Sequence, residues 1–348
     1  MKHLFSKFLF FICFISSFLA FAQKKNISVI GVGDMMLGTN YPDANYLPPN
    51  KGNDLLAPVE SILKDADITF GNLEGSVLDK GGAVKSCSDP AKCYAFRMPE
   101  YLLDNLTKAG FDLLSVANNH VGDFGNEGRD NMVKVLKEKG FAFAGLSSIP
   151  SVSFEKDGVK YGFCAFAPNS GTMDIRDIAG AVKIVKELAS KNDIVIVSFH
   201  GGAEGASHQH VTKKTENFLG ENRGNVYDFA HQVIDAGADI VFGHGPHVTR
   251  AVELYKNRFI AYSMGNFCTY KRFNLKAESG LAPIIKVNID SEGNFLSGKI
   301  TPIVQPHPGG VQLDSQKRVI AIMQKLTKAD FPDTKISISD EGEISIKK

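Results

Sequence analysis

The chain has 348 residues, of which 43% are hydrophobic and 22% are charged, a composition typical of globular proteins and unlike disordered, collagen-like or coiled-coil chains. Its 39 Lys and Arg residues nearly balance its 38 Asp and Glu residues, so it has no basic field to attract a phosphate backbone. We therefore expect no nucleic-acid partner.

The first 22 residues are typical of a secretory signal peptide. Lys2 and Lys7 precede an apolar run from Phe8 to Phe21, and small residues flank the expected cleavage site after Ala22. The run is shorter than the ~20 residues that a membrane-spanning helix prefers, which favours cleavage over a retained anchor. The sequence therefore predicts an exported protein, in the periplasm or at the cell surface.

Export makes disulfide bonds permissible, and two of the cysteines are close in sequence. Cys87 and Cys93 flank a short polar loop, so a local disulfide between them is one hypothesis. Cys164 and Cys268 lie in apolar, strand-like segments and are interpreted as buried thiols.

From residue 26 onward, short β-rich apolar runs alternate with amphipathic helical stretches, the pattern of an α/β protein with parallel strands. Helices are predicted over residues 55–64, 100–109, 127–139, 178–190, 227–236 and 316–326. Antiparallel strands are predicted over residues 251–254, 259–263, 284–290, 295–304, 335–339 and 343–347. No Pro/Ser-rich linker separates these elements, so residues 23–348 are predicted to form a single domain.

Five predicted strands end on polar or glycine-rich clusters. Because ligands in open α/β sheets bind beyond the carboxyl ends of the strands, these clusters are predicted to share one rim. The side chains concerned are Asp34, Glu74, Asn119, His120, His200, His244 and His247. Each histidine alone is best interpreted as an ordinary polar residue, but together the imidazole, carboxylate and carboxamide groups suit one or two ions of Mn, Zn or Fe.

Six motifs occur in a characteristic order along the chain. They are Gly33-Asp34-Met35-Met36-Leu37-Gly38, Asn72-Leu73-Glu74-Gly75, Ala117-Asn118-Asn119-His120, Phe199-His200-Gly201-Gly202-Ala203-Glu204, Gly243-His244-Gly245-Pro246-His247-Val248 and Tyr262-Ser263-Met264-Gly265-Asn266-Phe267. This order, over about residues 27–270, resembles the bacterial CapA capsule-synthesis family, which is linked to poly-γ-glutamate. The resemblance implies a metallophosphoesterase-like α/β sandwich of mixed sheets flanked by helices, with residues 281–348 completing a sheet.

The resemblance also implies roles for individual residues. Asp34 would be the ligand from the first strand, Glu74 the acid that bridges metals, and Asn119 a ligand beside a substrate-facing His120. His200 would be the lone histidine ligand, and His244 and His247 the final ligand pair.

This sequence departs from the wider superfamily at three of these sites. Met36 stands where the superfamily has a histidine, the bridging acid is Glu rather than Asp, and the last pair is spaced His-x-x-His. A mononuclear centre therefore stays open beside a dinuclear one.

The expected chemistry is hydrolysis, or transfer to an amine. A bound divalent ion lowers the pKa of its water to about 7, and His120 would protonate the leaving group. Arg223 and Arg250 are candidates for binding substrate carboxylates, with a solvated charge and a structural ion pair as the respective alternatives. Glu204 is predicted to orient His200 or a ligand, and Asn266 to contact substrate.

The sequence thus favours an exported metal-dependent hydrolase or transferase that acts in the synthesis or processing of poly-γ-glutamate or a related anionic polymer. A metal-dependent phosphoesterase is the first alternative. The second is a non-catalytic accessory subunit that binds polymer for a membrane synthase, with a degenerate metal site.

Overall fold

The computed structural model describes residues 26–86 and 93–347. The predicted signal peptide and Cys87 lie outside these residues, whereas Cys164 and Cys268 are buried free thiols, as expected. Among the described residues, no helix has both the length and the apolar character needed to span a membrane.

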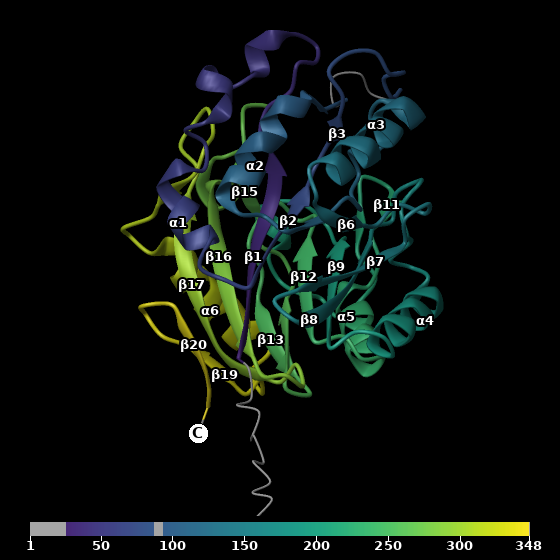
Figure 1. Ribbon diagram of the computed structural model, residues 1–348. Coiled ribbons are helices and arrows are strands. Elements are labelled where there is room, and N and C mark those ends of the chain that lie inside the picture. Colours follow the sequence, from purple (N-terminus) through teal and green to yellow (C-terminus); the bar gives the residue numbers. More distant parts are fainter. Residues whose placement is uncertain (1–25, 87–92, 348) are drawn as a thin grey trace, which may run out of the picture.

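The larger of two main sheets has ten strands and mixed direction (Figure 1). Its first part is parallel and consists of β1 (Ile27–Met36), β2 (Ile68–Leu73), β5 (Leu113–Ser115), β6 (Ala142–Ala144) and β15 (Asn266–Thr269). Its second part is antiparallel and consists of β16 (Leu281–Ile289), β17 (Phe295–Val304), β18 (Gln312–Leu313), β19 (Ile336–Ile338) and β20 (Glu343–Ile346). Strands β16 to β20 therefore extend the sheet to which β1 belongs.

The smaller main sheet has six strands in the order β13-β14-β12-β9-β8-β7. Their bounds are β7 (Ser151–Lys156), β8 (Val159–Phe166), β9 (Ile194–His200), β12 (Ile240–His244), β13 (Val252–Tyr255) and β14 (Arg258–Ala261). The four inner strands are parallel, and β7 and β13 are antiparallel edges. Two further pairs are short: β3 (Ser76–Val77) with β4 (Arg97–Met98), and β10 (Asn217–Phe218) with β11 (Glu221–Asn222).

The two main sheets face one another across a shared hydrophobic core. Val29 and Phe70 of the larger sheet and Ile196 and Phe242 of the smaller one belong to the same buried cluster. The rings of Phe70 and Phe242 stack with centroids 5.4 Å apart. Because each sheet buries its inner face against the other, the arrangement is a sandwich.

Most helices cover the outer faces of this sandwich, and one packs against the core between the sheets (Figure 1). The helices are α1 (Glu60–Leu63), α2 (Leu103–Ala109), α3 (Gly125–Glu138), α4 (Ile178–Ala189), α5 (Val226–Asp235) and α6 (Arg318–Asp330). The first three pack on the larger sheet and α4 and α5 on the smaller one, while α6 contacts β13, β16 and β17. The predicted fold class, an α/β sandwich of mixed sheets flanked by helices, is confirmed.

Local sequence explains where several helices begin and end. The side chains of Asp177 and Asn225 accept hydrogen bonds from backbone N–H groups in the first turns of α4 and α5. The prediction of one helix over residues 55–64 is wrong, because a 3₁₀ turn at Ala57–Val59 precedes only four α-helical residues. Pro58 within that turn lacks a backbone N–H and cannot continue the helical hydrogen bonding.

The carboxyl ends of β1, β2, β9 and β12 bring polar residues into register. Asp34 on β1 lies opposite Asn72 of β2 and Asn266 of β15, while His244 on β12 lies opposite His200 of β9. Strand register within each sheet therefore sets the spacing of the polar groups at the rim.

Candidate metal centre

Asp34 lies near the carboxyl end of β1, between the neighbouring strands β2 and β15 of the larger sheet. The backbone N–H of Asp34 donates to the carbonyl oxygen of Gly265 at 2.9 Å. A Cβ atom at Gly33 would overlap that same carbonyl, so only glycine fits before the aspartate. Asp34 is fully buried, and its Oδ1 accepts a hydrogen bond of 2.8 Å from Asn72 Nδ2. The carboxylate is thus held in one place by strand packing.

The smaller sheet brings histidines to the same carboxylate. His244 Nδ1 lies 3.1 Å from Asp34 Oδ1, and His247 Nδ1 lies 3.1 Å from Asp34 Oδ2. His247 Nε2 is in turn 3.7 Å from Glu74 Oε1. The backbone of His247 is left-handed, with φ of 55°, an uncommon conformation for a residue with a side chain. Histidines at and just after the end of β12 in the smaller sheet therefore contact Asp34 of β1 and Glu74, which follows β2, in the larger sheet.

Three of these groups are close enough to hold a single ion. Ligand atoms of Glu74, His200 and His247 all lie within 4.8 Å of one another. Asn72 Nδ2 lies 3.4 Å from His200 Nδ1, so the amide links this histidine to Asp34. Asn72 was not among the predicted site residues, although it stands two residues before Glu74 in the same motif.

Most of the predicted ligands carry a buried polar atom that lacks a hydrogen-bond partner within residues 26–86 and 93–347. These atoms are Asp34 Oδ2, both carboxylate oxygens of Glu74, Asn119 Oδ1, His200 Nε2 and His244 Nε2. Among the described residues, the charge contacts of His247 with Asp34 and Glu74, and of His120 with Glu74, offset only part of their loss of water, which is costly for charged oxygens. A divalent cation would satisfy oxygen and imidazole donors together. The donor set therefore fits a Zn, Mn or Fe ion.

The protonation of the rim reflects this burial. Burial raises the pKa of Glu74 well above its usual value, and the nearby charges of Asp34 and Glu204 add to the effect. Burial would also raise the pKa of Asp34, but hydrogen bonds and charges from His244 and His247 hold it well below its ordinary range. Burial would lower the pKa of His247, but the negative charges of Glu74 and Asp34 outweigh this effect and raise the pKa to about 10. Burial lowers the pKa of His200 well below that of free histidine.

His120 lies beside the rim and is held by a carboxylate that the sequence analysis missed. His120 Nδ1 is 2.8 Å from Asp123 Oδ2, and His120 Nε2 is 3.9 Å from Glu74 Oε1. Asp123 also pairs with Lys85 Nζ at 2.6 Å and accepts from the backbone N–H of Phe96. Burial lowers the pKa of His120, against the opposing effect of Asp123. The spacing of Asp123, three residues after His120, is the signal that could have indicated it.

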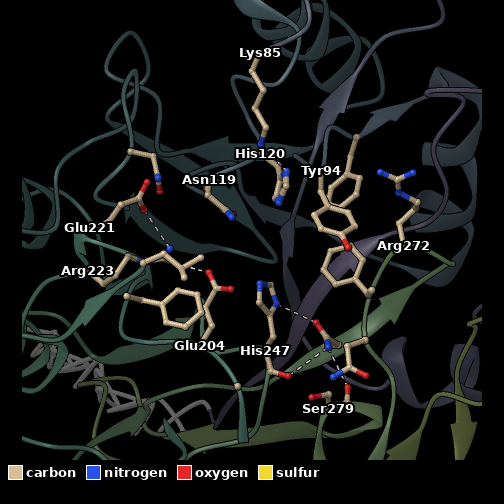
Figure 2. A pocket seen from close by; sticks show the side chains of 18 of the residues that line it. Lys85, Tyr94, Asn119, His120, Glu204, Glu221, Arg223, His247, Arg272 and Ser279 are labelled. Atoms are coloured by element: carbon tan, nitrogen blue, oxygen red, sulfur yellow. Dashed lines mark hydrogen bonds and ion pairs between the residues drawn. The ribbon is translucent and has the colours of Figure 1, made fainter. Parts of the chain in front are cut away.

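The rim opens into a cavity of about 830 Å³ (Figure 2). Asn119, His120 and His247 face this cavity together with Glu204 and Arg223. Arg223 Nη2 lies 3.1 Å from Glu204 Oε1, and Nη1 lies 3.5 Å from Glu221 Oε2. The structure therefore brings Arg223 and Glu204 to the cavity wall, where Glu204 pairs with Arg223 and not with His200.

Asn266 also lines the cavity, and its side chain contacts a predicted ligand. Asn266 Oδ1 lies 3.0 Å from His247 Nδ1, and Asn266 Nδ2 donates to the His247 carbonyl at 3.3 Å. Its amide thus fixes the ring of His247, a contact that the sequence prediction of substrate binding did not include.

The prediction that Arg250 contacts substrate is wrong. Arg250 has no exposed surface, and both terminal nitrogens pair with the two oxygens of Glu216 at 2.8 and 2.7 Å. One of them also donates to the Ala203 carbonyl. Arg250 is therefore a structural ion pair, the alternative considered from the sequence.

The fold and the rim together define a class: an α/β sandwich with a carboxylate–histidine cluster at its strand ends that could hold a metal ion. The pattern of the family described as "Bacterial capsule synthesis protein PGA_cap" matches residues 28–271, and the chain belongs to this family.

Similar curated proteins carry related descriptions. The chain is 25% identical to the "Capsule biosynthesis protein CapA" of Bacillus anthracis, over 87% of this chain and 72% of that protein. It is 27% identical to the "PGA biosynthesis protein CapA" of Bacillus subtilis, over 87% of this chain and 78% of that protein. A "Probable polyglutamine synthesis accessory protein" of Mycobacterium tuberculosis is 29% identical over 58% of this chain and 55% of that protein.

Solved structures with some likeness to this chain include two hydrolases. A putative 5'-nucleotidase from Staphylococcus aureus has a TM-score of 0.46 and 15% identity, covering 88% of this chain and 58% of that chain. A purple acid phosphatase from yellow lupin has a TM-score of 0.39 and 11% identity, covering 84% and 55%.

Proposed function

We propose that this protein is an exported metal-dependent hydrolase or transferase that acts in the synthesis or processing of poly-γ-glutamate or a related anionic polymer. The observation that carries the proposal is the set of buried ligand atoms, from both sheets, that lie near His120 and lack a hydrogen-bond partner among the described residues. Family membership and the descriptions of the Bacillus relatives support the choice of polymer. The predicted signal peptide supports export to the periplasm or cell surface.

Asp34, Glu74, Asn119, His200, His244 and His247 would hold one or two divalent ions. When bound, such an ion supplies a Lewis acid and lowers the pKa of a coordinated water.

His120 is the residue proposed to move a proton. Asp123 engages its Nδ1, which leaves Nε2 available on the cavity side near Glu74. An imidazole held in this way can protonate the leaving amine of a γ-glutamyl amide as the bond to carbon breaks. Lys85 fixes the second oxygen of Asp123, so the pair keeps its orientation.

Metal analysis and a turnover assay on poly-γ-glutamate test the proposal together. The metal-loaded protein should shorten the polymer, or transfer its ends to an added amine. A His120→Ala variant should lose about 10²–10⁴-fold in rate. The matched control is His210→Ala, which removes an exposed histidine that pairs with Asp330 and does not line the cavity.

Each of the other outcomes contradicts the proposal in a different way. Hydrolysis of a generic phosphodiester without any action on poly-γ-glutamate would favour a phosphoesterase. Binding of polymer without cleavage or transfer would favour an accessory subunit of a membrane synthase. Protein without bound metal and without turnover would reject the enzymatic proposal as a whole.

A further inference from the structure

Arg272 lies on the cavity wall across from Arg223 (Figure 2), and its guanidinium group contacts two aromatic rings. Its guanidinium carbon is 4.8 Å from the ring centroid of Tyr46 and 5.1 Å from that of Tyr94. Cation–π contacts of this kind fix the plane of a guanidinium group while leaving its N–H edges open. Within the part of the chain that the structure describes, Arg272 is therefore oriented by these ring contacts and not by a hydrogen-bonding partner.

Arg272 differs in its charge balance from the other basic groups that line the cavity. Lys85 pairs with Asp123, and Arg223 pairs with both Glu204 and Glu221. Within residues 26–86 and 93–347, no carboxylate pairs with Arg272, and its Nε is buried without a hydrogen-bond partner. Among the described residues, the cavity wall around Arg272 therefore carries a positive charge without a paired carboxylate, while Arg223 faces two carboxylates, Glu204 and Glu221.

The backbone presents Arg272 next to the rim. Lys271 and Arg272 both have left-handed backbones, with φ of 52° and 57°, which are uncommon for residues with side chains. Phe273, the next residue, packs its ring 5.5 Å from that of His247 and 5.1 Å from that of Phe96. Arg272 thus lines the same cavity as His120 and His247.

We propose that Arg272 is a substrate-recognition residue that binds a carboxylate of the polymer away from the reacting bond. This inference rests on the proposed function and names the Arg272 guanidinium as the group that distinguishes the substrate from polymers without free carboxylates. A planar guanidinium with free N–H edges matches a carboxylate in a two-pronged hydrogen bond. The acidic wall of Glu204 and Glu221 repels that carboxylate, so the substrate would enter in one orientation.

Calorimetric binding of a γ-linked glutamate tetramer to the metal-free protein tests this role. Arg272→Gln should weaken binding by about ten-fold to a hundred-fold, the range expected for hydrogen bonds to a charged group. Arg272→Lys should recover part of the loss, because it keeps the charge without the planar fork. The same tetramer with its α-carboxylates converted to primary amides should bind wild type and Arg272→Gln alike.

The matched control is Arg318→Gln, which removes an equal charge that pairs with Asp314 outside the cavity. Its affinity for the tetramer should equal that of wild type. In metal-loaded protein, Arg272→Gln should raise KM and leave kcat nearly unchanged, because a remote contact serves ground state and transition state equally. Thermal unfolding should show that Arg272→Gln folds like wild type.

The binding and turnover measurements separate the two proposals. If Arg272→Gln binds the carboxylate tetramer as tightly as wild type, or loses the amidated tetramer equally, the recognition role is overturned even when wild type cleaves the polymer. If the carboxylate-specific loss is seen but no metal-loaded protein turns the polymer over, the recognition role stands and the enzymatic proposal fails.

Discussion

Two buried charged clusters at the strand ends of this protein differ in how completely their atoms are partnered. In the Arg250–Glu216 pair, both carboxylate oxygens and both terminal nitrogens are engaged, and only Arg250 Nε lacks a partner. In the rim, Asp34, Glu74 and His200 are equally buried, yet each has a ligand atom without a hydrogen-bond partner among the described residues. Burial of charge is common to both, so incomplete partnering is the feature that indicates a ligand.

The largest expected effect is on metal binding by the rim. His200→Ala and Glu74→Gln each remove a member of the three-residue group whose ligand atoms lie within 4.8 Å. We expect metal affinity to fall by more than the ~10–100-fold that is typical when only a supporting residue is changed. Metal analysis after dialysis measures the loss. Retention of a full complement by both variants would mean that these atoms are not ligands.

The second effect is on stability and concerns the partnered cluster. Arg250→Ala leaves Glu216 buried without its cation and should destabilise the fold by about 3–5 kcal/mol. Folded Arg250→Ala should nevertheless bind as much metal as wild type. Arg250→Met combined with Glu216→Leu should recover most of the stability, because neither charge is then buried alone. Denaturant unfolding measures the stability of both variants. Loss of metal by folded Arg250→Ala would contradict the separation of the Arg250–Glu216 pair from the metal site.

The third effect comes from removal of metal by a chelator. A cation present at a hundred times its dissociation constant stabilises the folded state by about 2.7 kcal/mol, and chelation removes this contribution. The melting temperature of wild type should therefore fall when a chelator is added, and that of Glu74→Gln should change little. Equal shifts in the two proteins would show that the chelator acts elsewhere.

The smallest effect concerns the support of His120. Asp123→Asn weakens the 2.8 Å contact that holds the imidazole and should lower turnover by roughly 10–100-fold. Metal content should stay at the wild-type level, since Asp123 is not among the rim ligands. Steady-state kinetics beside metal analysis tests this, and a parallel loss of metal would place Asp123 in the rim itself.

The positions of the rim residues could be predicted from the sequence because each stands directly after a recognisable apolar run. Each ligand follows an apolar strand, and parallel strands deliver their carboxyl ends to one edge, so Asp34, His200 and His244 follow from pattern and topology. Glycine and histidine clusters at these ends were visible without any structure. The core strands and most helices were predictable for the same reason, namely their regular hydrophobic periodicity.

The remaining features depend on contacts between segments far apart in the sequence. Arg250 finds Glu216 in an irregular loop 34 residues earlier, and nothing in either local sequence indicates the pairing. Arg272 is oriented by Tyr46 and Tyr94, which come from distant segments with no recognisable motif. Whether a charge ends in a structural pair or on a cavity wall is decided by tertiary packing.

The most direct test is an anomalous-scattering map of crystals grown with Mn or Zn. The account predicts density for one or two ions within coordination distance of Asp34 Oδ2, the Glu74 carboxylate and His200 Nε2. An ion bound only elsewhere, or an empty rim in crystals saturated with metal, would contradict it.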